Sequence, residues 1–276
     1  MIVKARSTLS SYMTRLLSSG RVVFSREEAL SALVTDRRAL LDAAERQQRR
    51  HALISPRRGF YVIVPPQYLS WGAPPPSWYI DDLMRYEGHP YYVGLLKAAE
   101  LHGATHQAVM EFQVATEKRL PQIRAGRSII TFHYRQNMSA IQGGIEKKKT
   151  DTGYMNVSTV ELTVLDLVRY PRASGGLDNI ATIISDLGSR IDSAKLAALS
   201  PKFERSVAQR LGYLLERFGH ADRAGAFHRT LFQGAAPPWV ELEPSQAKHD
   251  TVLMHEPKEQ DERWRVIVRR MPERDE

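Results

Sequence analysis

The chain has 276 residues, of which 42% are hydrophobic and 25% are charged. This composition is typical of a folded globular protein and excludes disordered, collagen-like and fibrous classes. The sequence contains no cysteine, which excludes a disulfide-stapled domain, a thiolate metal site and a cysteine nucleophile. No apolar run reaches the roughly 18 residues that a membrane-spanning helix needs, and no apolar signal core follows Met1. We therefore expect a soluble cytoplasmic protein.

The net charge of +8 is distributed unevenly along the chain. Residues 1–60 contain twelve lysines and arginines against five acidic residues, so this segment carries +7, whereas the other 216 residues carry only +1. A local excess of positive charge indicates a polyanionic partner for that segment. On charge alone, a solubilising arginine-rich surface remains the alternative.

A proline-rich stretch predicts a domain boundary. Residues 65–76 contain five of the chain's fifteen prolines. Because proline fixes φ and donates no amide hydrogen, we expect a stiff linker or a surface strap there. The predicted division is a first domain over residues 1–64, a linker over 65–76 and a second domain over 77–276.

The first domain is predicted to contain three short helices. Apolar residues recur at helical spacing over Thr8–Ser18, which predicts the first helix. Ser25 and Glu28 have the spacing of a capping box and predict a second helix, with Arg26 in its first turn. Thr35 is the predicted cap of a third helix that starts one residue later. Two short capped helices joined by a tight turn are typical of a helix-turn-helix.

The third helix is the predicted reader of DNA. Its apolar side is formed around Leu40, and the opposite side carries Arg38, Arg46 and Arg49. In the major groove, an arginine on such a side can bond the O6 and N7 atoms of guanine in bidentate fashion. Arg37 lies nearer the edge of this side, where it could reach either a base or a phosphate.

The segment after the third helix predicts a basic hairpin. Two β-prone runs flank Pro56-Arg57-Arg58-Gly59, so both arginines are expected at the tip and along DNA phosphates or in the minor groove. Three helices followed by such a hairpin indicate a winged helix-turn-helix that binds nucleic acid. The predicted DNA-binding residues are Arg26, Arg37, Arg38, Arg46, Arg49, Arg57 and Arg58.

The second domain is predicted to mix helices and strands, which gives an α+β fold class for the chain as a whole. Helices are expected over Ser77–Glu87, over Tyr91–Leu101, after a Ser158–Glu161 capping box, and from Ser200-Pro201 to about Phe218. Strands are expected at Phe112–Thr116, Ser128–Arg135, Met155–Val157, Trp239–Leu242 and Trp264–Val268.

The sequence contains no nucleophile elbow, no phosphate-binding loop and no dinucleotide-binding glycine motif. His102 and His106 are four residues apart, which suits a metal on one continuous helix, but Gly103 lies between them and no third ligand is evident. We expect these histidines to have a packing or hydrogen-bonding role.

One further pattern resembles part of a nuclease site. Glu146 and Lys148, together with Asp81 or Asp82, could imitate metal-binding carboxylates and a lysine. Because the pair follows two glycines in polar surroundings, we expect a solvated loop instead. We accordingly predict no enzymatic activity, no catalytic residue, no metal site and no cofactor.

Seven segments, in both predicted domains, carry a resemblance to a known family. They are Arg57–Ile63, Trp78–Met84, Tyr91–Ala104, Phe112–Val114, Ser158–Val168, Tyr170-Pro171 and Gly175–Leu177. In these segments the sequence resembles the AbiEi antitoxins, the transcriptional-regulator half of bacterial type IV toxin–antitoxin (abortive infection) operons.

The resemblance implies a protein with two functions. The first domain would bind inverted repeats in double-stranded DNA upstream of its own operon and repress transcription. The second domain would counteract a nucleotidyltransferase-like toxin without forming a stable complex with it. The resemblance supplies no residue motif for the antitoxin activity and is weakest after about residue 235. A ligand-sensing winged-helix repressor without a toxin partner and a DNA-targeted nuclease remain the alternatives.

Overall fold

The computed structural model describes residues 8–104, 109–243 and 256–273, and it divides the chain into two compact units. Unit 1 consists of Met1–Tyr91, Met110–Gln136 and Lys147–Asn156, and unit 2 consists of Tyr92–Val109, Asn137–Glu146 and Val157–Glu276. These units differ from the predicted division at residues 65–76, because the chain returns to unit 1 twice after Tyr91. Sequence spacing gives no sign of such returns.

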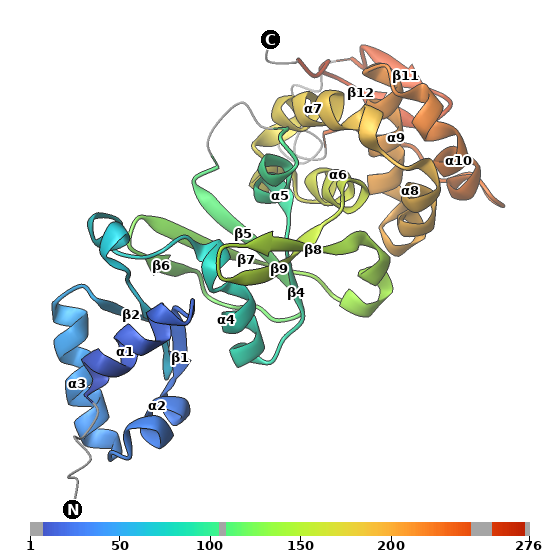
Figure 1. Cartoon of the computed structure of the whole chain (residues 1–276). Coiled ribbons are helices and arrows are strands. Elements are labelled where there is room, and N and C mark those ends of the chain that lie inside the picture. The colour runs from blue at the N-terminus through green and yellow to red at the C-terminus, as the bar shows by residue number, and fades with distance from the viewer. Residues whose placement is uncertain (1–7, 105–108, 244–255, 274–276) are drawn as a thin grey trace, which may run out of the picture. The chain divides into compact units, whose positions relative to one another are not determined.

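The first part of unit 1 contains three helices and a small antiparallel sheet (Figure 1). The elements are α1 (Leu9–Ser18), β1 (Val23–Ser25), α2 (Arg26–Leu33), α3 (Arg37–Arg49), β2 (Leu53–Arg57) and β3 (Phe60–Ile63). The strand order is β1-β3-β2, with antiparallel pairing throughout. The predicted three helices and the hairpin are confirmed.

Aromatic packing joins the helices of this part to its sheet. Phe24 is 1% exposed, and its ring lies edge-on to Tyr12, with the centroids 5.5 Å apart, and stacks on Tyr61 at 5.2 Å. Leu40 of α3 is buried in the same cluster. Because these residues come from α1, β1, α3 and β3, burying their apolar surface fixes the position of α3.

The helix caps agree with the sequence prediction at α2 and differ by one residue at α3. The Ser25 hydroxyl accepts a hydrogen bond from the Glu28 amide at 3.1 Å, as the capping box predicts. For α3, Asp36 is the cap: its Oδ1 accepts from the amide of Ala39 at 2.9 Å. The prediction of Thr35 was wrong because both residue types are good caps and lie side by side.

The proline-rich residues form short 3-10 helices, Pro66–Trp71 and Pro76–Trp78, because proline is tolerated in the first turn of a helix. α4 (Ile80–Glu87) follows, with Tyr79 rather than Ser77 at its N-cap position.

The predicted helix over Tyr91–Leu101 is wrong in its first part. The structure has strand β4 (Tyr91–Val93) there and begins α5 (Leu95–Leu101) after an extended Gly94.

The larger sheet is mixed and has six strands in the order β6-β7-β5-β4-β9-β8 (Figure 1). Besides β4, its strands are β5 (Glu111–Thr116), β6 (Ile123–Ala125), β7 (Ser128–Tyr134), β8 (Ile145–Thr150) and β9 (Gly153–Ser158). β5 pairs with β7 in parallel, and β6 pairs with β7 antiparallel. The three predicted strands over this region are confirmed. The expected solvated loop at Glu146 is wrong, because these residues belong to strand β8 at the end of the sheet.

Unit 2 is mainly helical. Its helices are α5, α6 (Val160–Arg169), α7 (Gly176–Leu187), α8 (Ser193–Leu199), α9 (Arg205–Arg217) and α10 (Ala221–Leu231). α6 is the central one, since every residue from Val160 to Val168 is buried. The N-cap of α6 is Thr159 rather than Ser158. The long helix predicted from Ser200 is instead a 3-10 turn, Ser200–Lys202, followed by α9.

A small sheet completes the described part of unit 2. It consists of β10 (Val240–Glu241), β11 (Glu259–Asp261) and β12 (Val266–Val268), in the order β10-β12-β11. This confirms the strands predicted near Trp239 and Trp264. In the ranges that the structure describes, no helix combines the length and the apolar character needed to cross a membrane.

Candidate nucleic-acid interface

α3 has an apolar face that is buried and a charged face that is exposed. Leu40 is 1% exposed and Ala44 is 2% exposed, so this side of the helix is fixed in the core. Successive helical residues are about 100° apart, which places Arg38 and Arg49 within about 20° of each other on the other side. The helix has four exposed arginines among the predicted residues: Arg37, Arg38, Arg46 and Arg49.

Most of this positive charge is not neutralised within the described residues. Arg49 forms an ion pair with Glu45, with Nη2 2.6 Å from Oε1, but the two side chains are 75% and 59% exposed. Such exposed pairs contribute little and exchange readily with other partners. The other three arginines of the face form no ion pair in the part of the chain that the structure describes. α3 therefore presents guanidinium groups that are free to bind an anionic partner.

The turn that leads into α3 has an unusual residue that sequence reasoning missed. Val34 has a φ of 47° and is 89% exposed. A β-branched residue rarely adopts positive φ, and residues in such strained backbone conformations cluster at functional sites. Val34 and Arg46 together line a groove of about 350 Å³ that is formed by the start of α1, the end of α2 and one side of α3. The only signal in the sequence is an apolar residue directly before the cap of α3.

The hairpin tip is packed within unit 1 rather than free in solution. Arg57 is 18% exposed in its side chain, and its Nε donates to Glu87 at 2.8 Å. Its Nη2 donates to the carbonyl oxygen of Pro121 at 2.7 Å, and its guanidinium lies 5.6 Å from the centre of the Phe132 ring. These contacts give Arg57 a structural role. Arg58 is exposed, and its carbonyl oxygen accepts from the Tyr86 hydroxyl at 2.9 Å.

Arg26 faces the hairpin turn as well. Its amide donates to the carbonyl oxygen of Gly59 at 2.8 Å, and its half-buried guanidinium lies against the same glycine. Gly59 has a φ of 85°, and a side chain there would collide with Arg26 and Tyr86. The seven predicted residues thus fall into two groups. The first, on α3, is Arg37, Arg38, Arg46 and Arg49, and the second, at the hairpin, is Arg26, Arg57 and Arg58.

The different surroundings of Arg57 and Arg58 give a testable contrast. Arg57→Met should lower the free energy of unfolding by about 1–3 kcal/mol, because Glu87 and the Pro121 carbonyl lose a charged, part-buried donor. Arg58→Met, at the neighbouring exposed position, should change it by less than about 0.5 kcal/mol. Urea unfolding of both variants measures the difference. Equal unfolding midpoints would contradict a structural role for Arg57.

A family model matches the second part of the chain. Residues 92–217 match the model of the AbiEi antitoxin C-terminal domain. Residues 92–217 are an AbiEi antitoxin domain. The match includes the segments from Tyr92 to Leu177 that resemble this family, whose members are antitoxins of toxin–antitoxin, or abortive infection, systems.

A solved structure shares the fold over nearly the whole chain. The Rv2827c protein from Mycobacterium tuberculosis superposes with a TM-score of 0.66 at 17% sequence identity, over 95% of this chain and 92% of that chain. At this identity the likeness establishes the fold alone. No protein of curated function matches the sequence.

Buried polar side chains hold the AbiEi domain together around α6. Asp166 accepts a hydrogen bond from the Tyr92 hydroxyl at 2.6 Å. His102 Nε2 lies 2.8 Å from the carbonyl oxygen of Ser158, and the Ser158 and Thr163 hydroxyls are 2.6 Å apart. His102 therefore has the hydrogen-bonding role that its sequence context predicts, and His106 lies outside the described residues.

The nuclease-like pattern is not assembled into a metal site. Glu146 is exposed and Lys148 is half-buried on β8, while Asp81 and Asp82 lie in the first turn of α4, where both pair with Arg85. Among the described residues, no three His, Asp or Glu side chains lie close enough together to hold a metal ion.

Proposed function

We propose that this protein is a DNA-binding autorepressor and the antitoxin of a type IV toxin–antitoxin system. The observation that carries the proposal is the presence, in one chain, of an AbiEi antitoxin domain and a separate helix with four exposed arginines. The first supplies the antitoxin activity, and the second supplies a surface for the operator DNA. The protein acts in the cytoplasm and counteracts a nucleotidyltransferase-like toxin without a stable complex.

α3 enters the major groove in this proposal. Arg38 and Arg49 project from one side of the helix, where they can reach guanine O6 and N7. Arg37 and Arg46 flank them and are placed to contact phosphates on either side of the groove. Arg58 is exposed at the hairpin turn and can add a backbone contact. Arg57 is not part of the interface, because its guanidinium is already bonded within unit 1.

Binding to DNA should depend steeply on salt. If the protein neutralises about six phosphates, its affinity for a duplex that carries the operon's upstream inverted repeat should fall about a thousandfold between 50 and 200 mM salt. Fluorescence anisotropy with a labelled duplex measures this, and a scrambled duplex of equal length is the control for sequence preference. A fall of less than about tenfold would contradict phosphate-dominated binding by an arginine face.

A further inference from the structure

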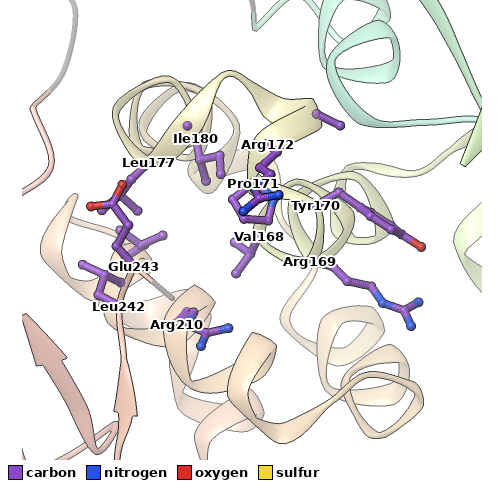
Figure 2. A pocket seen from close by; sticks show the side chains of 13 residues that line it. Val168, Arg169, Tyr170, Pro171, Arg172, Leu177, Ile180, Arg210, Leu242 and Glu243 are labelled. Carbon is purple, nitrogen blue, oxygen red and sulfur yellow. The ribbon is translucent and has the colours of Figure 1, made fainter. Parts of the chain in front are cut away.

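A pocket in unit 2 has the size of a small-molecule site (Figure 2). Its volume is about 530 Å³, within the range of ligand pockets in proteins. It lies among the end of α6, the 3-10 turn Pro171–Ser174, α7, α9 and the residues after β10. Most of its wall is apolar and is formed by Val168, Pro171, Leu177, Ile180, Leu214 and Leu242.

One side of this pocket is formed by a cation, Arg210. Arg210, on α9, is partly buried, and its Nε donates to the carbonyl oxygen of Glu241 at 2.8 Å. That bond fixes the plane of the guanidinium and leaves its two terminal nitrogens for another acceptor. No carboxylate of the described residues forms an ion pair with Arg210. Its burial lowers the pKa of the guanidinium, because desolvation disfavours the charged form.

The other charged side chains at the pocket do not compensate Arg210. Glu243 is paired with Arg270, with Oε2 3.6 Å from Nε, and in Figure 2 its carboxylate points away from Arg210. Arg169 turns away as well, since its Nη2 binds Glu204 at 2.8 Å. Arg172 is exposed near Pro171 and adds a second positive charge. The pocket therefore has an excess of positive charge inside an apolar wall.

We propose that this pocket binds a small molecule with an apolar body and a single oxyanion headgroup, a carboxylate or a phosphate, held by Arg210. A guanidinium offers parallel N–H groups that fit two oxygens of either headgroup. The apolar body shields the apolar wall of the pocket from water, and the headgroup supplies a counter-charge for Arg210. A neutral apolar ligand would leave the cation desolvated and unpaired. This site goes beyond the antitoxin and DNA-binding functions and does not depend on either.

Titration calorimetry of the full-length protein with three probes tests the charge requirement. The probes are 4-phenylbutyrate, phenyl phosphate and the neutral 4-phenylbutanol. At least one anion should bind at a single site about tenfold or more tightly than the alcohol, and the tighter of the two identifies the headgroup. Equal binding of the alcohol and both anions, or no binding of any probe at millimolar concentration, would overturn the proposal.

Three variants test whether Arg210 is the anion-binding residue. Arg210→Met keeps a similar length and should weaken the anions by about 10- to 100-fold without weakening the alcohol. Arg210→Lys keeps the charge but not the planar fork and should have intermediate affinity. Arg217→Met removes an exposed arginine from the same helix and should bind as the unchanged protein does.

Circular dichroism checks the fold of each variant. If Arg210→Met does not fold, the Arg210→Lys result decides. Anion affinity that is unchanged by substitution of Arg210 would overturn the proposal.

Discussion

Replacing Arg38 and Arg49 together with alanine should weaken binding to the operator by about 2–6 kcal/mol, because each guanidinium is expected to read a guanine at a cost of about 1–3 kcal/mol when lost. Preference for the operator over a scrambled duplex should fall in parallel, since base contacts rather than phosphate contacts are removed. The fold should be retained, because both side chains are exposed and Leu40 and Ala44 hold α3 in the core.

The matched control removes the same charge from another surface. Arg217→Ala combined with Arg229→Ala takes two exposed arginines from α9 and α10 and leaves α3 intact. This control should change operator affinity by less than about threefold at 0.15 M salt, because neither arginine belongs to the proposed DNA interface and salt screens exposed charges outside it. Anisotropy titrations of both double variants provide the comparison. Equal losses in the two proteins would show that total charge, not the α3 face, determines binding.

Trp264→Ala should lower the free energy of unfolding by about 3–5 kcal/mol, which is more than the loss expected for Arg57→Met. Trp264 is fully buried, and its ring lies 5.5 Å from Phe227 and 4.9 Å from His228, measured between centroids. It also covers Gly212 of α9, where a side chain would overlap the indole. The indole thus ties the last strands of unit 2 to α9 and α10, and its removal leaves a cavity among them.

Trp239→Ala is the matched control, because Trp239 lies in the same unit but is 40% exposed. It should cost less than about 1 kcal/mol. Urea unfolding followed by circular dichroism at 222 nm compares the two variants without relying on tryptophan emission. If both unfold at the same urea concentration, the assignment of Trp264 as the anchor of the last strands is incorrect.

The parts of the fold that the sequence predicts are those with strong local signals. The capping box at Ser25 and the apolar spacing around Leu40 lie within a few residues of the elements that they specify. At Tyr91–Val93 the same apolar residues suit either a helix or a strand, and pairing with β9 decides for the strand. Glu146 has no apolar alternation, so strand β8 is determined by its neighbour in the sheet rather than by its own residues.

The same contrast between local and long-range determinants applies to the candidate site. The arginine face of α3 can be found from periodicity alone, because all its members belong to one helix. The role of Arg57 cannot, since its partners Glu87 and Pro121 lie 30 and 64 residues away in the chain. Arg210 has no distinctive sequence context either. Only the fold places the residues after β10 beside α9 and shows that no carboxylate of the described residues pairs with this arginine.

Coexpression with the product of the neighbouring gene, the proposed toxin, tests most directly whether DNA binding and antitoxin activity belong to different parts of the chain. Cells that carry the full-length Arg38→Ala/Arg49→Ala variant and an operator-driven reporter should grow as well as cells with the unchanged protein, while the reporter loses its repression. Loss of growth at an equal protein level, or repression that persists, would contradict the account.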